Sequence, residues 1–331
     1  MKFGVSLFGD HPRTVSPDEQ FETLVEQAGA ARRAGFDCLG GGHHYLVEDW
    51  HRFQVMPALS RLAAECASMH IFPMFLAPLH HPVDIAERFA TLDAIPGGRA
   101  IFSPVAGYRD VEFESFGIPK AERFTRLYEC VELVERLWTE DDVTYDGNHF
   151  SVDGVTINHK PVQEPRPPIW IGANTDRAIM NAAKYGDAWF ANPHEDTETI
   201  ARQASIADTP DGDGFHGVQP GIREVFVADT DEEAVEISRT AFEDYYEWYK
   251  SEGQDDATEN PTSFGAFTES RFIVGSPETV ADQLVEFHER TGVDCLILSM
   301  RKPAITHEQT LYAIELAGKQ VIPAVRERVE D

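Results

Sequence analysis

The chain has 331 residues, 42% of them hydrophobic, and its 57 acidic and 28 basic residues give a formal net charge of −29 at pH 7. This length can bury a sizeable core, and one barrel of alternating strands and helices would account for residues 1–331 as a single domain. A strongly negative surface repels nucleic acid and anionic membranes, so neither is an expected partner.

The acidic residues are spread along the chain rather than gathered in a tail. Because salt screens the repulsion among such charges, the composition favours a halophilic protein over an ordinary acidic mesophilic enzyme. We therefore expect the midpoint of thermal unfolding to rise between dilute buffer and molar salt. An unchanged midpoint would contradict this expectation.

Apolar runs of strand length alternate with amphipathic helical stretches along the chain. The runs lie near residues 2–8, 36–41, 69–77, 98–104, 168–173, 187–191, 222–229 and 293–299. Several are apolar on both faces, as in parallel strands that helices cover. Eight such runs predict an α/β fold, a (β/α)8 TIM barrel. Ser16-Pro17 and Ser276-Pro277 predict two of the helix starts.

Three regions interrupt this alternation. Residues 142–157 have the pattern of a β-hairpin around a glycine-containing turn. Residues 207–221 are rich in Asp, Gly and Pro, and residues 251–269 are small and polar, so both predict long loops. Loops of this length in enzymes often serve as lids, interface arms or mobile insertions.

The remaining bulk features favour a cytoplasmic protein. Cys38, Cys66, Cys130 and Cys295 are widely spaced and form no C-x-x-C motif, which predicts reduced cysteines in the core. The start of the chain does not resemble a secretion signal, because the run Phe3 to Phe8 is only strand-length. No stretch approaches the roughly 18 apolar residues of a membrane span.

Histidines gather where the predicted strands end. The second run leads to His43 and His44, and further histidines at such ends are His11, His80 and His81. Because strand side chains alternate, only one of His43 and His44 is expected to face the barrel mouth. A metal hydrolase is an alternative, but the H-x-H and H-E-x-x-H patterns are absent, so we expect a bound organic cofactor and no metal.

Small residues follow the fourth and fifth runs, at the end of a barrel where active sites lie. The fourth leads to Ala106, Gly107 and Tyr108, and the fifth to Gly172, Ala173, Asn174 and Thr175 at the start of a helix. Free amides at a helix start could cradle a phosphate. An ordinary short turn between strand and helix would need the same residues.

Taken together, these segments resemble the bacterial luciferase-like family of flavin-dependent monooxygenases over nearly the whole chain. The resemblance rests on the order and spacing of Gly35-Phe36-Asp37 before His43-His44-Tyr45, then His81-Pro82, Gly97-Gly98-Arg99, Gly107-Tyr108, Pro168-Ile169-Trp170-Ile171-Gly172 and Gly275-Ser276-Pro277-Glu278. The family fold is a (β/α)8 barrel, in agreement with the predicted strands.

The resemblance implies that reduced FMN from a separate flavin reductase reacts with O2 and a small organic substrate. It aligns His43 with the family's catalytic histidine, whose neutral imidazole could accept or return a proton. A homodimer is also expected. The implied cofactor-binding residues are Met74, Phe75, Ala106, Gly107, Tyr108, Gly172, Ala173, Asn174, Thr175 and Arg177.

Two details of the resemblance are specific to single positions. The family tends to have a cis peptide under the flavin, which would fall at Pro73-Met74 in this chain. Bacterial luciferase itself has a phosphate-binding arginine where this chain has Ala106, and Arg177 or Arg109 could compensate.

Two alternatives within the same fold remain open. One is an F420-dependent oxidoreductase, which transfers hydride and needs no O2. The other is a non-catalytic flavin-binding subunit. The sequence does not indicate the substrate.

Overall fold

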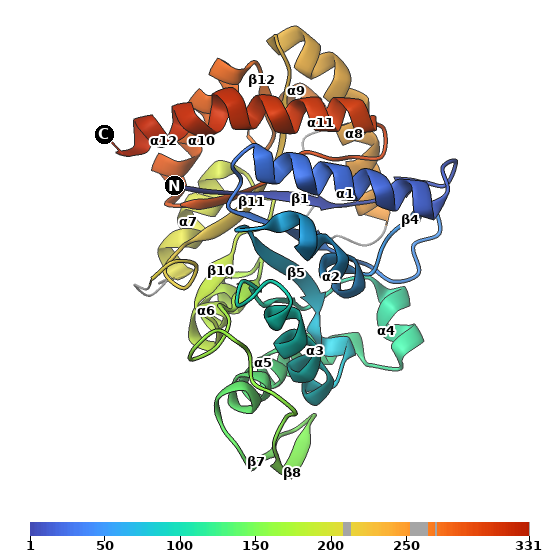
Figure 1. Ribbon diagram of the computed structural model, residues 1–331, viewed down its shortest axis with the longest axis vertical. Coiled ribbons are helices and arrows are strands. Elements are labelled where there is room, and N and C mark those ends of the chain that lie inside the picture. The colour runs from blue at the N-terminus through green and yellow to red at the C-terminus, as the bar shows by residue number, and fades with distance from the viewer. Residues whose placement is uncertain (208–212, 252–263, 269, 331) are drawn as a thin grey trace.

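The computed structural model describes residues 1–207, 213–251, 264–268 and 270–330. Its centre is one strongly curled parallel sheet. Along the sheet the strands are β10 (Ala188–Phe190), β9 (Trp170–Gly172), β6 (Ser103–Val105), β5 (His70–Leu76), β3 (Cys38–Gly42), β1 (Lys2–Phe8), β13 (Cys295–Ser299), β11 (Pro220–Val227) and β12 (Ile273–Gly275). An isolated parallel bridge between Ala191 and Gly221 joins the end of β10 to β11. The curled sheet is therefore consistent with the predicted TIM barrel, and helices lie around its outside (Figure 1).

All eight predicted strand runs overlap with a strand of this sheet. Strand β12 was not predicted. It has only three residues and pairs with the end of β11, outside the eight-strand alternation.

Helices connect most of these strands. They are α1 (Pro17–Arg33), α2 (Val55–Cys66), α3 (Pro82–Ala94), α4 (Asp110–Phe116), α5 (Arg123–Thr139), α6 (Asp176–Tyr185), α7 (Thr197–Ala207), α8 (Asp231–Ser251), α9 (Phe264–Thr268), α10 (Pro277–Thr291), α11 (His307–Leu316) and α12 (Ile322–Glu330). The two helix starts predicted from Ser-Pro pairs are confirmed. The Ser276 hydroxyl accepts a hydrogen bond from the Thr279 amide, whereas Ser16 makes no such side-chain bond.

The predicted hairpin is confirmed, whereas the predicted loops are confirmed only in part. Strands β7 (Val143–Asp146) and β8 (Ser151–Val155) pair antiparallel and project from one end of the molecule (Figure 1). Helix α9 lies within the predicted loop 251–269, so that prediction was wrong over those residues. Residues 208–212, 252–263 and 269 of the two predicted loops lie outside the described residues.

The barrel interior below the strand ends is filled with side chains. Phe72, Trp170, Phe190 and Ile297 belong to one buried cluster, and the Trp170 indole N–H donates to the carbonyl of Phe215 at 3.0 Å. All four cysteines are buried and free, as predicted. In the described part of the chain, no helix is long and apolar enough to cross a bilayer.

The expected cis bond at Pro73-Met74 is wrong. Among the described residues, the cis peptide bond of the structure joins Glu164 to Pro165. Strand β5 instead continues in register through this position, with Pro73 beside Gly41 and Met74 beside Gly42.

Gly40 lets strands β3 and β5 lie side by side. A Cβ atom built on Gly40 would lie 1.9 Å from the Phe72 carbonyl oxygen, a backbone atom that the sheet holds in place. We expect Gly40→Ala to lower the free energy of unfolding by about 3 kcal/mol, the upper end of ordinary overpacking costs. Chemical denaturation would measure this. Gly265→Ala is the matched control, because nothing lies within 4 Å of its added methyl group; equal losses in both variants would contradict the argument.

Candidate active site

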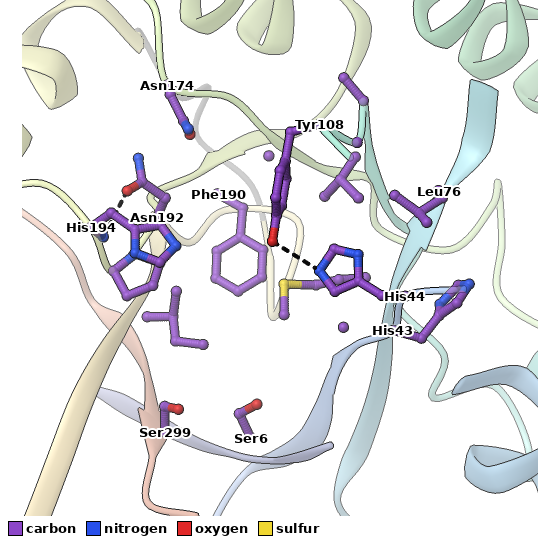
Figure 2. Close-up of a pocket in the computed structure, with 18 of the residues that line it drawn as sticks. Ser6, His43, His44, Leu76, Tyr108, Asn174, Phe190, Asn192, His194 and Ser299 are labelled. Carbon is purple, nitrogen blue, oxygen red and sulfur yellow. Dashed lines mark hydrogen bonds between the residues drawn. The ribbon is translucent and has the colours of Figure 1, made fainter. Parts of the chain in front are cut away.

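A cavity of about 430 Å³ opens at the carboxyl ends of the barrel strands. Its lining comes from residues in or just after β1, β3, β5, β6, β9, β10, β11 and β13, together with Arg52, Tyr245 of α8, and Lys120, Arg123 and Phe124 at and just before the start of α5. Figure 2 shows that labelled side chains from these segments surround a common space. Both its size and its position are typical of a barrel enzyme's ligand site.

Most of the predicted site residues line this cavity. They are His43, Met74, Ala106, Gly107, Tyr108, Gly172, Ala173, Asn174 and Thr175. Phe75 and Arg177 do not line it. Phe75 follows Met74 on β5, so its ring points to the other face and packs against Phe89 at 5.9 Å between centroids. Arg177 is exposed on the first turn of α6.

His44 points into the cavity from the end of β3 (Figure 2). Its Nδ1 lies 3.1 Å from Glu112 Oε1, and its Nε2 lies 3.3 Å from the Tyr108 hydroxyl. Glu112 is fully buried and also accepts the Tyr45 backbone N–H at 2.8 Å. The carboxylate favours a proton on Nδ1, which leaves Nε2 as the acceptor on the cavity side.

The electrostatics of His44 keep it neutral at neutral pH. Burial lowers its pKa below the ordinary value, and the hydrogen bond to Glu112 opposes this shift without reversing it. A neutral imidazole whose outer nitrogen carries no proton can act as a general base. The buried carboxylate would then stabilise the imidazolium that forms.

His43 lies beside His44, but its ring is turned away from the centre of the cavity (Figure 2). It packs edge-on against Tyr45, with centroids 5.1 Å apart, and against Phe75 at 5.7 Å. Both ring nitrogens are buried without a hydrogen-bond partner in the described part of the chain. Burial lowers its pKa to about 3. Only one of the two histidines thus faces the mouth, and it is His44; the catalytic role of His43 stays a prediction.

One end of the cavity has the features of an anion cradle. Asn174 and Thr175 line it immediately before α6, and the Thr175 hydroxyl accepts the Ala178 amide at 3.4 Å. Lys120, in the short 3-10 turn before α5, and Arg123, the first residue of α5, line the same cavity. We did not predict these two cations from the sequence; their place three residues apart at a helix start, Lys120-Ala121-Glu122-Arg123, was the available signal.

Arg109, one of the two arginines that we expected to compensate for Ala106, has another position. It is buried, donates to the Tyr45 carbonyl at 2.5 Å and lies 3.7 Å from Glu112. Arg109 therefore supports the segment that carries His44 and does not line the cavity.

A second group of charged residues lines the cavity near the ends of β1, β11 and β13. It comprises Arg52, Glu224, Arg301 and Lys302, with Ser6 and Ser299 beside them. This group was not predicted from the sequence. Within the described residues, no three His, Cys, Asp or Glu side chains come together in a way that could hold a metal ion.

Residues 1–295 match the luciferase-like monooxygenase family, and the chain belongs to this family of barrel oxidoreductases, whose members use flavin or F420. A particular relative is the FMNH2-dependent dimethylsulfone monooxygenase of Pseudomonas putida, which is 28% identical over 287 residues, 80% of this chain and 77% of the relative. The F420-dependent glucose-6-phosphate dehydrogenase of Microbacterium testaceum is 31% identical over 190 residues, 54% of this chain and 56% of the relative.

Solved structures share the fold over nearly the full length. A monooxygenase from Streptomyces bottropensis has a TM-score of 0.88 at 23% identity and covers 98% of this chain and 99% of its own. The FMN-bound oxygenating component of 3,6-diketocamphane monooxygenase from Pseudomonas putida has a TM-score of 0.80 at 18% identity, with 98% of each chain covered. At these identities the likeness is one of fold.

Proposed function

We propose that this protein is a monooxygenase that uses reduced FMN and O2 to oxidise a small organic substrate. The observation that carries the proposal is the lining of one cavity, which includes two cations, Lys120 and Arg123, a helix start after Thr175 and the neutral imidazole of His44. The relative that matches most of the chain at 28% identity is an FMNH2-dependent monooxygenase, which supports the same choice.

The residues present fit FMN. Lys120, Arg123 and the helix start after Thr175 would hold its phosphate, because cations and helix N-termini both favour phosphate groups. Gly107 lines the cavity with φ +77°, and a Cβ atom there would lie 3.0 Å from Leu76, so this turn of the lining favours glycine. The Asn192 side-chain amide lines the cavity, and its buried nitrogen has no partner in the described part of the chain.

Reduced FMN, when bound, supplies the electrons that activate O2. In this proposal, the chain moves a proton and excludes water. His44 Nε2 accepts a proton, Glu112 stabilises the resulting charge, and the Tyr108 hydroxyl orients the ring. Met74, Leu76 and Phe190 provide apolar walls that limit water. The reduced FMN would come from a separate reductase, and a homodimer remains our expectation.

The choice between FMN and F420 needs a direct experiment, because F420-dependent enzymes are also relatives of this chain. Under strict exclusion of O2, the protein is titrated with reduced FMN and with reduced F420, and binding is followed by absorbance and fluorescence. We expect tighter binding of FMN, and O2 uptake when air is admitted. Tighter binding of F420 with hydride transfer in the absence of O2 would overturn the proposal.

A further inference from the structure

The second charged end of the cavity is separate from the proposed phosphate cradle. In Figure 2, Asn174 lies above the space and Ser299 below it, with His194 and Asn192 between them on the left and His44 on the right. Arg301 and Lys302 follow Ser299 directly and line the cavity. The proposed cofactor phosphate and these two cations therefore belong to different ends of one site.

Arg301 is buried, and within the described residues its guanidinium forms hydrogen bonds with neutral groups. It is 9% exposed and donates to the Asp10 carbonyl oxygen at 2.9 Å and to His11 Nδ1 at 2.7 Å. Burial and the nearby arginines lower the pKa of His11 to about 2, so this imidazole is a neutral acceptor. Burial lowers the pKa of Arg301 to about 10, which still leaves it charged at neutral pH.

The acidic side chains around Arg301 are engaged by other cations. The Asp10 carboxylate receives Arg52 Nε at 2.6 Å and a second Arg52 nitrogen at 2.5 Å. The Glu224 carboxylate pairs with Lys302, which also donates to the Ser299 hydroxyl at 2.8 Å. Within the residues that the structure describes, Arg301 forms no ion pair. A buried charge without a counter-charge is costly, so this position favours an incoming anion.

On this basis, and building on the proposed monooxygenase function, we propose that the substrate is a small organic monoanion whose carboxylate or sulfonate group binds Arg301. The planar guanidinium fork suits the oxygens of either group. Ser6 and Ser299 place hydroxyl groups on the same side of the cavity (Figure 2). The uncharged end of such a substrate would extend toward His44, where the oxidation takes place.

The first test compares charged probes with neutral analogues on the FMN-loaded wild-type protein. Calorimetric titrations in buffer free of chloride and phosphate use pentanoate, pentanamide, butane-1-sulfonate and butyl methyl sulfone. We expect at least one anion to bind at least tenfold more tightly than its neutral analogue, and the better anion distinguishes a carboxylate from a sulfonate. Equal affinities within both pairs would overturn the proposal.

The second test removes the charge of Arg301. Arg301→Gln keeps an N–H donor for the Asp10 carbonyl, and we expect it to weaken anion binding at least tenfold while the affinities for neutral probes and for FMN stay unchanged. Arg61→Gln, on the exposed face of α2, is the matched control and should change none of these. Loss of FMN affinity in Arg301→Gln would assign the guanidinium to the cofactor and overturn the proposal.

Two further results keep this proposal separate from the proposed function. If Arg301→Gln does not fold, the comparison of anionic with neutral probes on the wild-type protein decides the question alone. Arg301→Lys retains the positive charge and should keep the preference for anions. If the wild-type protein prefers anions but neither binds FMN nor consumes O2 with reduced FMN, the anion site stands and the monooxygenase function fails.

Discussion

Replacing His44 by glutamine should lower kcat/KM for substrate oxidation by about 10²- to 10⁴-fold, the range typical of losing a general acid or base. Glutamine retains an N–H donor for Glu112, so the buried carboxylate keeps a partner while the titrating nitrogen is removed. Steady-state O2 uptake with reduced FMN measures the loss. Circular dichroism and the affinity for FMN should match the wild-type protein.

The pH dependence gives an independent readout for His44. Activity requires the neutral imidazole and should fall as the pH drops through its pKa, which burial lowers below the ordinary value. Glu112 opposes that lowering, so Glu112→Gln should move the acid limb of the profile to still lower pH. A purely structural histidine would leave the position of this limb unchanged.

His43 provides the internal comparison, because the sequence resemblance assigns the catalytic role to it. We expect His43→Gln to reduce kcat/KM by less than His44→Gln, since its ring is turned away from the cavity centre (Figure 2). A larger loss in the His43 variant would return the role to His43. Full activity in both variants would exclude a catalytic role for either histidine.

The two histidines illustrate where prediction from the sequence stopped. Side-chain alternation correctly implied that one of them faces the mouth, but the choice depends on the backbone immediately before them. Gly41 has φ +145°, a conformation that glycine adopts readily and other residues rarely do. The regular alternation of side chains along β3 is therefore interrupted before His43, and counting residues cannot tell which face its side chain points to. The pairing of β3 with its neighbours fixes this conformation.

The barrel itself was accessible because buried parallel strands leave continuous apolar runs in the sequence. Strand ends then located most of the cavity lining, since all eight ends meet at one face. Alternation could also have excluded Phe75, the neighbour of Met74 on β5. Lys120, Arg123 and Arg301 could not be found in this way, because a charged residue at a helix start or after a strand has the same local pattern whether it faces solvent or a cavity.

The proposed phosphate cradle gives the second large expected effect. Replacing Lys120 and Arg123 together by glutamine should weaken FMN binding by about 10- to 100-fold, because each substitution would remove a charge-assisted hydrogen bond to the FMN phosphate. Riboflavin has no phosphate, so its affinity should be the same in the variant and the wild-type protein. Fluorescence titrations with both flavins measure the difference.

Arg177→Gln is the matched control, because the sequence placed Arg177 at the cofactor whereas the structure leaves it exposed and outside the cavity lining. We expect no change in its affinity for FMN. The ratio of FMN to riboflavin affinity in the wild-type protein should also fall as salt screens the phosphate contacts. If riboflavin binding falls as much as FMN binding in the double variant, Lys120 and Arg123 support the cavity walls rather than the phosphate. If Arg177→Gln weakens FMN binding and the double variant does not, the phosphate binds at α6 instead.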